Sequence, residues 1–155
     1  MTRKKLIKKI LPKANFIYNN ILTTLLINKL LKNGKKSLAQ KIVHNIFNYI
    51  LIKTNKNPQI IFEQAIRNIC PRVKLKTNKI GGANYQIPVL LNIFNGINYA
   101  IRWLLEISRK KSGKQIYIKI ATEILEAAKG TGTTIKKKEE IHRLAKANKA
   151  FLIRD

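Results

Sequence analysis

The spacing of hydrophobic residues predicts a chain that is almost entirely helical. Apolar side chains recur every three or four residues, a period that places them on one face of an α-helix. The period occurs in six segments: 16–31, 37–51, 58–71, 97–105, 116–128 and 133–151. Glycines in "KNGKK" and "KGTG" are expected to end helices, and Asn57-Pro58 is expected to begin one. Ser37 followed by Gln40 is a capping-box pattern that predicts the start of the second helix.

One stretch, over about residues 72–91, breaks the helical period. Here apolar residues occupy every second position, which is typical of β-strands. The alternating apolar residues are Val73, Leu75, Tyr85, Ile87 and Val89. Gly81-Gly82 between the two runs predicts a tight turn, because glycine adopts positive φ without strain. We expect a β-hairpin between the third and fourth helices, with one apolar face and one polar face.

These patterns predict a mainly α fold: a six-helix, bundle-like domain with one projecting β-hairpin. The chain of 155 residues fits one domain. Residues 1–15 are basic and show little periodicity, so we expect a basic N-terminal tail, followed by a single helical domain over residues 16–155. No apolar run approaches the roughly 20 residues of a membrane-spanning helix. The basic start has no apolar core of a secretory signal, and it is too poor in Ser and Arg for a transit peptide.

The net charge of the chain is the property that best indicates what kind of partner it binds. Lys and Arg number 32 against 7 Asp and Glu, a formal net charge of +25, which is far more than solubility requires. The first acid in the chain is Glu63. Basic residues cluster in five places, mostly at breaks between helices: residues 3–13, 32–36, 72–79, 109–114 and 136–138. Such a distribution indicates a nucleic acid partner. Because aromatic clusters of the kind that stack single-stranded bases are missing from the sequence, folded RNA recognised by shape fits best.

Little in the sequence supports catalysis. His44 and His142 have no Ser, Cys or carboxylate at a spacing that a helix would bring together for nucleophilic catalysis. Metal-ligand spacings are also missing. Cys70 has no second Cys to pair with, and we expect it to be a small buried hydrophobic residue. We therefore predict no catalytic residues, no metal, no cofactor and no enzymatic activity.

Six phrases in the sequence together resemble a known family. They are "NGKKSLAQKIV", "IGGANYQIPV", "AIRWLLE", "RKKSG", "ILEAAKGTG" and "KKKEEIHRLAKANKAF". Over residues 16–151 the chain resembles small-subunit ribosomal protein seven, the universal bacterial-type family of bacteria, plastids and mitochondria. "KTNKNP", "AIRWLL" and "AAKGTG" are most similar to plastid members.

The resemblance implies six helices with a hairpin between the third and fourth, and a role in translation. It implies that the protein binds the 3′ major domain of small-subunit rRNA, nucleates assembly of the head with other head proteins, and lies near the exit-site tRNA and the mRNA path, without a membrane partner. The rRNA-binding residues implied for this chain are Arg3, Lys4, Lys5, Lys8, Lys9, Lys35, Lys36, Arg72, Lys74, Lys76, Arg102, Arg109, Lys110, Lys111, Lys114, Lys136, Lys137, Lys138 and Arg143. The residues implied to lie near tRNA and mRNA are Lys79, Ile80, Gly81 and Gly82.

The alternatives follow from the same charge. A basic architectural nucleic-acid-binding protein or regulator outside the ribosome is the second hypothesis, and an RNA-modifying enzyme is the third. The bias towards Ile, Lys and Asn is expected of A- and T-rich codons, as in organelle genomes. Together with the plastid-like phrases it implies an organelle-encoded plastid protein without a transit peptide, and the mitochondrion or the bacterial cytoplasm is the alternative.

Overall fold

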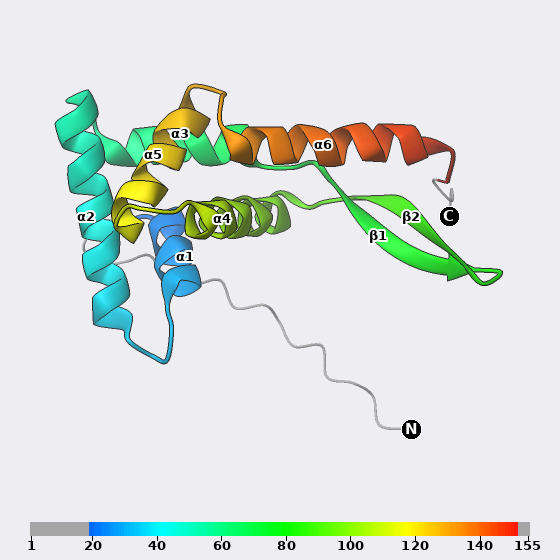
Figure 1. Cartoon of the computed structure of the whole chain (residues 1–155), viewed down its shortest axis with the longest axis horizontal. Helices are drawn as coiled ribbons and strands as arrows, with labels where there is room; N and C mark the ends of the chain where they lie inside the picture. Colours follow the sequence, from blue (N-terminus) through cyan, green and yellow to red (C-terminus); the bar gives the residue numbers. More distant parts are fainter. Residues whose placement is uncertain (1–18, 152–155) are drawn as a thin grey trace.

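A computed structural model describes residues 19–151 of the chain (Figure 1). The predicted basic tail of residues 1–15, with Arg3, Lys4, Lys5, Lys8 and Lys9, lies outside the described residues, as does the predicted helix start at residue 16. In chain order the elements are α1 (Ile21–Leu30), α2 (Lys36–Thr54), α3 (Pro58–Ile69), β1 (Val73–Ile80), β2 (Ala83–Leu90), α4 (Ile93–Lys110), α5 (Ile116–Ala128), α6 (Thr133–Ala147) and the short 3-10 helix η1 (Asn148–Phe151).

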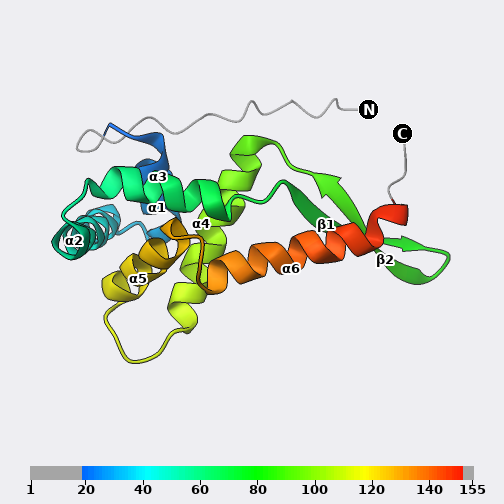
Figure 2. The same ribbon diagram turned by 90° about the horizontal axis from the view of Figure 1, so that it is seen from above.

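The helices pack into one body, from which the β1–β2 hairpin projects at the end opposite α2 (Figures 1 and 2). Helix α6 runs along the body towards the hairpin, where α6 contacts β1 and η1 contacts β2. The mainly helical fold and the place of the hairpin between α3 and α4 confirm the prediction. Within residues 19–151, every helix is too short or too polar to span a lipid bilayer.

The core lies around α5, which contacts α2, α3, α4 and α6. Ile120, Ala121 and Ile124 of this helix are completely buried. In α3 the apolar residues that follow the helical period of the predicted segment 58–71 face the core, since Ile61, Phe62, Ala65, Ile66 and Ile69 are all buried. The predicted period therefore identifies the buried side of the helices, because burial of one apolar stripe is what stabilises a helix in a packed domain.

Helix ends agree with the prediction at α3 and differ at α2. Asn57 caps α3 as predicted, its side-chain oxygen accepting a hydrogen bond from the Gln59 backbone N–H at 3.0 Å. Helix α2 begins at Lys36, one residue before Ser37, so the predicted capping box is wrong. The reason is the preceding turn: Asn33 and Gly34 have φ of +50° and +72° and direct the chain into the helix before Ser37 is reached.

The hairpin has no purely apolar face, contrary to the prediction. Gly81 and Gly82 have φ of +58° and +87°, the two positive values of a two-residue type I′ turn. In the register that this turn sets, Ile80 lies opposite Ala83. Each residue of β1 with an odd number therefore lies opposite a residue of β2 with an even number. Paired residues share a face. The apolar residues of the predicted alternation stand at odd positions in both strands, so Val73 and Leu75 of β1 lie on the opposite face from Tyr85, Ile87 and Val89 of β2.

Candidate nucleic-acid interface

The base of the hairpin is joined to α6 by a hydrogen bond between distant parts of the chain. The backbone N–H of Arg72 donates to Nε2 of His142 at 3.3 Å. Burial of the imidazole, together with the positive charges of Lys138 and Arg72, lowers the pKa of His142 below its ordinary value. The neutral imidazole that accepts this bond is therefore the favoured form at neutral pH.

A groove of about 350 Å³ lies beside this contact, between the hairpin base and α6. Its apolar lining comes from Val73, Pro88, Leu90 and Ala145, and its cationic rim from Arg72, Lys146 and Lys149. Sequence reasoning included Arg72 but missed the two lysines. The available signal was their spacing, because residues 142, 145, 146 and 149 follow the helical period; the first three share one side of α6, and Lys149 lies in η1, which follows it.

A second groove, of about 480 Å³, lies between the end of α1 and the outer side of α4. Arg102, Arg109 and Lys110 of α4 line it together with Lys29 of α1 and one acid, Glu106. Arg102 and Arg109 are both exposed. Lys29 was also missed from the sequence, where it stands alone in the last turn of an apolar helix. Four cations around one carboxylate leave a net positive groove, which suits an anionic ligand.

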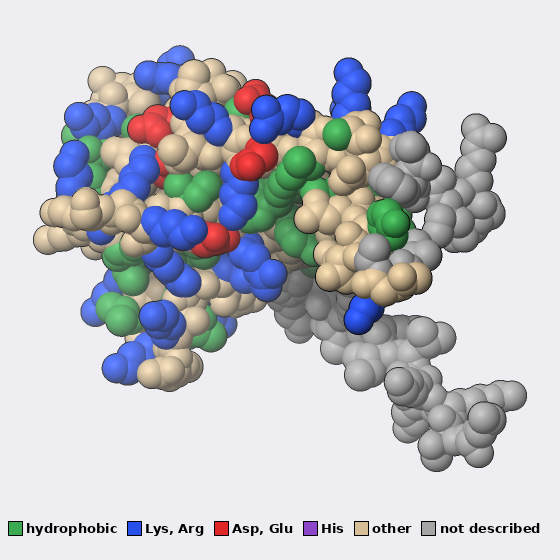
Figure 3. Space-filling view, turned by 45° about the vertical axis from the view of Figure 1, so that its right-hand side comes forward, with side chains coloured by type: hydrophobic (Ala, Val, Ile, Leu, Met, Phe, Trp, Pro, Cys, Tyr) green, Lys and Arg blue, Asp and Glu red, His purple; other side chains and the backbone are tan. Residues whose placement is uncertain are grey.

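The predicted rRNA-binding residues divide into two groups in the structure. The first group is exposed and forms no ion pair with another described residue: Lys35, Lys36, Arg72, Lys76, Arg102, Arg109, Lys114, Lys136 and Arg143. Lys74 is half-buried. At the hairpin tip Lys79, Gly81 and Gly82 are exposed. One face of the molecule shows Lys and Arg side chains spread over the helical body with few acids among them (Figure 3).

The residues of the second group form ion pairs or hydrogen bonds with other residues of the protein. Lys137 bonds Glu106 at 3.0 Å, and its ammonium lies 5.8 Å from the centre of the Trp103 ring. The hydrogen bond from Lys137 is the main cause of a lowered pKa at Glu106. Lys138 donates to the backbone oxygen of Asn68 at 2.5 Å. Lys110 pairs with Glu106 at 3.4 Å across one turn of α4, with its side chain still 74% exposed.

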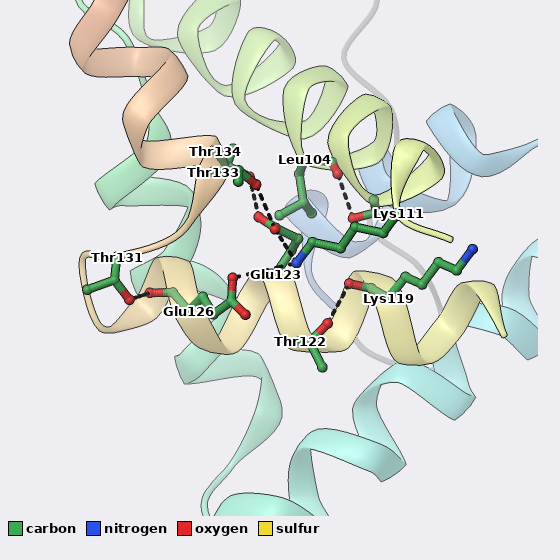
Figure 4. Close-up of polar contacts among 10 residues, drawn as sticks. Leu104, Lys111, Lys119, Thr122, Glu123, Glu126, Thr131, Thr133 and Thr134 are labelled. Carbon is green, nitrogen blue, oxygen red and sulfur yellow. Dashed lines mark hydrogen bonds and ion pairs between the residues drawn. The ribbon is translucent and has the colours of Figure 1, made fainter. Parts of the chain in front are cut away.

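Lys111, also in this group, lies at the junction of α4, α5 and α6 (Figure 4). Its ammonium is 2.5 Å from Glu123 and 3.6 Å from Glu126. Glu123 is completely buried and also accepts hydrogen bonds from Thr133 at 2.8 Å and Thr134 at 2.6 Å. The segment "GTGTT", which contains both threonines, therefore holds a carboxylate of the protein itself.

Neither grooves nor clusters in the described part of the chain indicate a metal centre. Residues 19–151 contain no group of three or more His, Cys, Asp or Glu side chains close enough to hold an ion. Cys70 is only partly buried, which corrects the prediction of a buried residue. Burial still raises the pKa of its thiol, and a neutral thiol is a poor metal ligand. The exposed chemistry of this surface is cationic, and it suits binding to a polyanion.

Comparison with known proteins connects this surface to a family. Residues 1–149 match the family model described as Ribosomal protein S7p/S5e. The small ribosomal subunit protein uS7c of Trieres chinensis is 46% identical over 144 residues, which cover 93% of this chain and 91% of that protein. Both findings confirm the resemblance of the sequence to small-subunit ribosomal protein seven. The chain belongs to the ribosomal protein S7p/S5e family, whose members are structural constituents of the ribosome rather than enzymes.

Proposed function

We propose that the protein binds the 3′ major domain of small-subunit rRNA and nucleates assembly of the head of the small subunit. The observation that carries this proposal is the cationic groove on α4, where Lys29, Arg102, Arg109 and Lys110 surround a single carboxylate. Phosphate oxygens of folded RNA are the ligand that such a groove fits, in a chain with a net charge of +25. The basic residues of the tail, outside the described residues, are proposed to add further phosphate contacts.

The exposed cations are proposed to position the protein rather than to read a sequence. Lys and Arg bonded to phosphates fix the register and orientation of a protein on RNA and carry little base information. Lys35 and Lys36 lie at the start of α2, Arg109 lies in the last turn of α4, Lys114 lies between α4 and α5, and Lys136 lies in the first turn of α6. Cations at separate helix ends can contact separate parts of a folded RNA, which supports recognition by shape.

The hairpin is proposed to lie near the exit-site tRNA and the mRNA path, with Lys79 to Gly82 at its tip. Its strands of eight residues extend about 26 Å. Lys79, Gly81 and Gly82 are exposed at the tip, and glycine lets a backbone approach a ligand more closely than residues with a Cβ allow. An exposed, narrow and glycine-tipped arm suits contact with RNA at a distance from the helical body.

The proposed partners are small-subunit rRNA, other head proteins, and tRNA and mRNA at the exit site. We place the protein in the plastid, because the relative uS7c is a plastid small-subunit protein and is 46% identical to this chain. The alternative is a nucleic-acid-binding regulator outside the ribosome. The same charge supports it, whereas membership of the ribosomal family favours the ribosome.

Binding to matched RNA transcripts tests the proposal. The full chain is titrated, at about 150 mM salt, with a folded transcript of the 3′ major domain, with a 5′-domain transcript of equal length, and with random duplex DNA. The proposal predicts the tightest binding to the 3′ major domain, and co-sedimentation of the protein with small subunits reconstituted on that rRNA. Equal affinity for all three ligands would instead support the regulator.

A further inference from the structure

We infer that Lys111 is the internal counter-ion of Glu123 and a positioning residue for the basic segment 109–114 at the end of α4, rather than a ligand of RNA. The inference rests on the proposed function in one respect: the other cations of segment 109–114, such as Arg109 and Lys114, are taken to contact RNA. It departs from what the sequence suggested, because "RKKSGK" offers Lys111 as one of several equivalent basic residues.

The polar contacts of Glu123 are complete without any external group. One carboxylate oxygen accepts from Lys111 at 2.5 Å and from Thr133 at 2.8 Å, and the other accepts from Thr134 at 2.6 Å. The carboxylate is completely buried, and a buried charge is stable only when it is paired and hydrogen-bonded. Lys111 supplies that pairing, so its ammonium cannot move out to a phosphate without leaving the buried carboxylate without a counter-charge.

The acid–base properties of the pair agree with this geometry. Burial alone would raise the pKa of Glu123, yet the hydrogen bonds from Lys111, Thr134 and Thr133 lower it below its ordinary value. Burial alone would lower the pKa of Lys111, yet the hydrogen bond and charge of Glu123 raise it. Both groups are therefore charged at neutral pH, as an ion pair requires.

Lys111 connects the end of α4 to the part of α5 that holds the loop 129–132. Lys111 also lies 3.6 Å from Glu126, whose backbone oxygen accepts hydrogen bonds from the N–H and the hydroxyl of Thr131. Gly132, with φ of +100°, passes so close that an added Cβ would lie 3.0 Å from the Cβ of Glu126. The loop 129–132 is thereby folded back onto the last turn of α5 (Figure 4).

The cations of the basic segment 109–114 differ in what their side chains contact. The Lys111 side chain is 34% exposed and directed inwards to Glu123, whereas Arg109 and Lys114 are exposed. Lys111 fixes the chain that carries the other two. Loss of RNA binding on mutation of Lys111 would then follow from a displaced segment, and removing the charge of Glu123 at the same time should restore it.

A mutant cycle tests the inference, with Lys111→Met, Glu123→Gln and the double variant. Gln carries no charge, and it can accept a hydrogen bond from one threonine hydroxyl through its carbonyl oxygen and donate one to the other hydroxyl through its amide group. We expect Lys111→Met to lower the folding equilibrium constant about tenfold or more, because it leaves an unpaired buried carboxylate. The double variant should recover most of this loss in urea unfolding. Additive losses in the cycle would overturn the inference, whatever the RNA measurements show.

The RNA readout uses Lys114→Met as the matched control. The slope of log affinity against log salt should fall by about 0.7 to 0.9 for each lost phosphate contact. We expect the slope of the Lys111→Met/Glu123→Gln variant to equal that of the wild type, with the slope of Lys114→Met lower. A fall of the same size in the double variant would make Lys111 an RNA ligand and overturn the inference. If the wild type shows no salt-dependent RNA binding, the proposed function fails and the unfolding cycle still decides the inference.

Discussion

The Arg72 backbone N–H donates a hydrogen bond to Nε2 of His142 at 3.3 Å, across 70 residues of sequence. This contact fixes the base of the hairpin to α6. It exists only while Nε2 is unprotonated, since a protonated imidazole has no acceptor nitrogen. This hydrogen bond between the hairpin base and α6 is therefore lost when His142 is protonated.

A pH dependence of stability follows from this loss. The folded protein holds the pKa of His142 below its ordinary value near 6.5, so on acidification the unfolded chain takes up this proton first. The stabilising contribution is complete above about pH 6.5 and is lost as the pH falls through the lowered pKa. We expect the free energy of unfolding in urea to fall more between pH 7.5 and pH 5 for the wild type than for His142→Gln.

His44→Gln provides the matched control, because His44 is exposed on α2, far from the hairpin. This variant keeps the contact between Arg72 and His142, so its free energy of unfolding should fall more on acidification than that of His142→Gln. Identical profiles for the wild type and His142→Gln would contradict the account of this contact.

Gly96 is required by close packing between α4 and the end of α3. An added Cβ would lie 2.6 Å from the Cys70 sulfur and 2.9 Å from the Pro71 backbone oxygen. We expect Gly96→Ala to lower the free energy of unfolding by about 1 to 3 kcal/mol through overpacking, despite the better helix propensity of Ala. Gly96→Ala combined with Cys70→Ala should recover part of the loss, since the sulfur is the nearer atom. A Gly96→Ala variant as stable as the wild type would refute the packing argument.

Lys136 and Lys137 are neighbours with different expected roles. Lys136 is exposed, whereas Lys137 bonds Glu106 and lies over the Trp103 ring. We expect Lys137→Met to lower the free energy of unfolding by about 0.5 to 1 kcal/mol with no change in the salt dependence of RNA binding. Lys136→Met should reduce that salt dependence and leave stability unchanged. Unfolding curves and RNA titrations of the two variants check both results. A lower stability of Lys136→Met together with a lower salt dependence of Lys137→Met would contradict the roles given to the two residues.

The hairpin tip can be removed without disturbing the strand register. Replacing residues 79–84 by Asn-Gly joins Asn78 to Tyr85, which are paired in the native hairpin, through a sequence that favours a type I′ turn. We expect this variant to fold and to co-sediment with small subunits as the wild type does. Its defect should appear in protection of exit-site tRNA from chemical probes. Loss of folding would show that the tip belongs to the core.

Sequence periodicity was sufficient for the helices and insufficient for the hairpin faces. The buried side of α3 is predictable because the pattern of apolar residues and the helical period are both local properties. Which side chains share a face of a hairpin depends on register, and register follows from the turn. The pair Ile80–Ala83 is fixed by a two-residue turn, which the apolar alternation alone does not specify.

The cationic surface was predictable in outline and not residue by residue. Arg109 belongs to a basic cluster of the sequence and Arg102 is implied by the family resemblance, and both side chains are exposed in the structure. Lys111, Lys137 and Lys138 belong to equally basic runs, yet their partners Glu123, Glu106 and Asn68 lie 12 to 70 residues away in sequence. Because such partners meet only in the folded chain, a single sequence cannot separate an internal cation from one that faces solvent.

The salt dependence of RNA affinity tests the central claim most directly. Binding of the full chain to the folded 3′ major domain of small-subunit rRNA is measured between about 50 and 200 mM salt, together with an Arg102→Ala/Arg109→Ala variant. If the cationic surface makes six to ten phosphate contacts, affinity should fall by about three to five decades over this range, with a shallower slope for the variant. An affinity that does not change with salt, or equal slopes for the two proteins, would contradict the proposal that this surface binds the RNA.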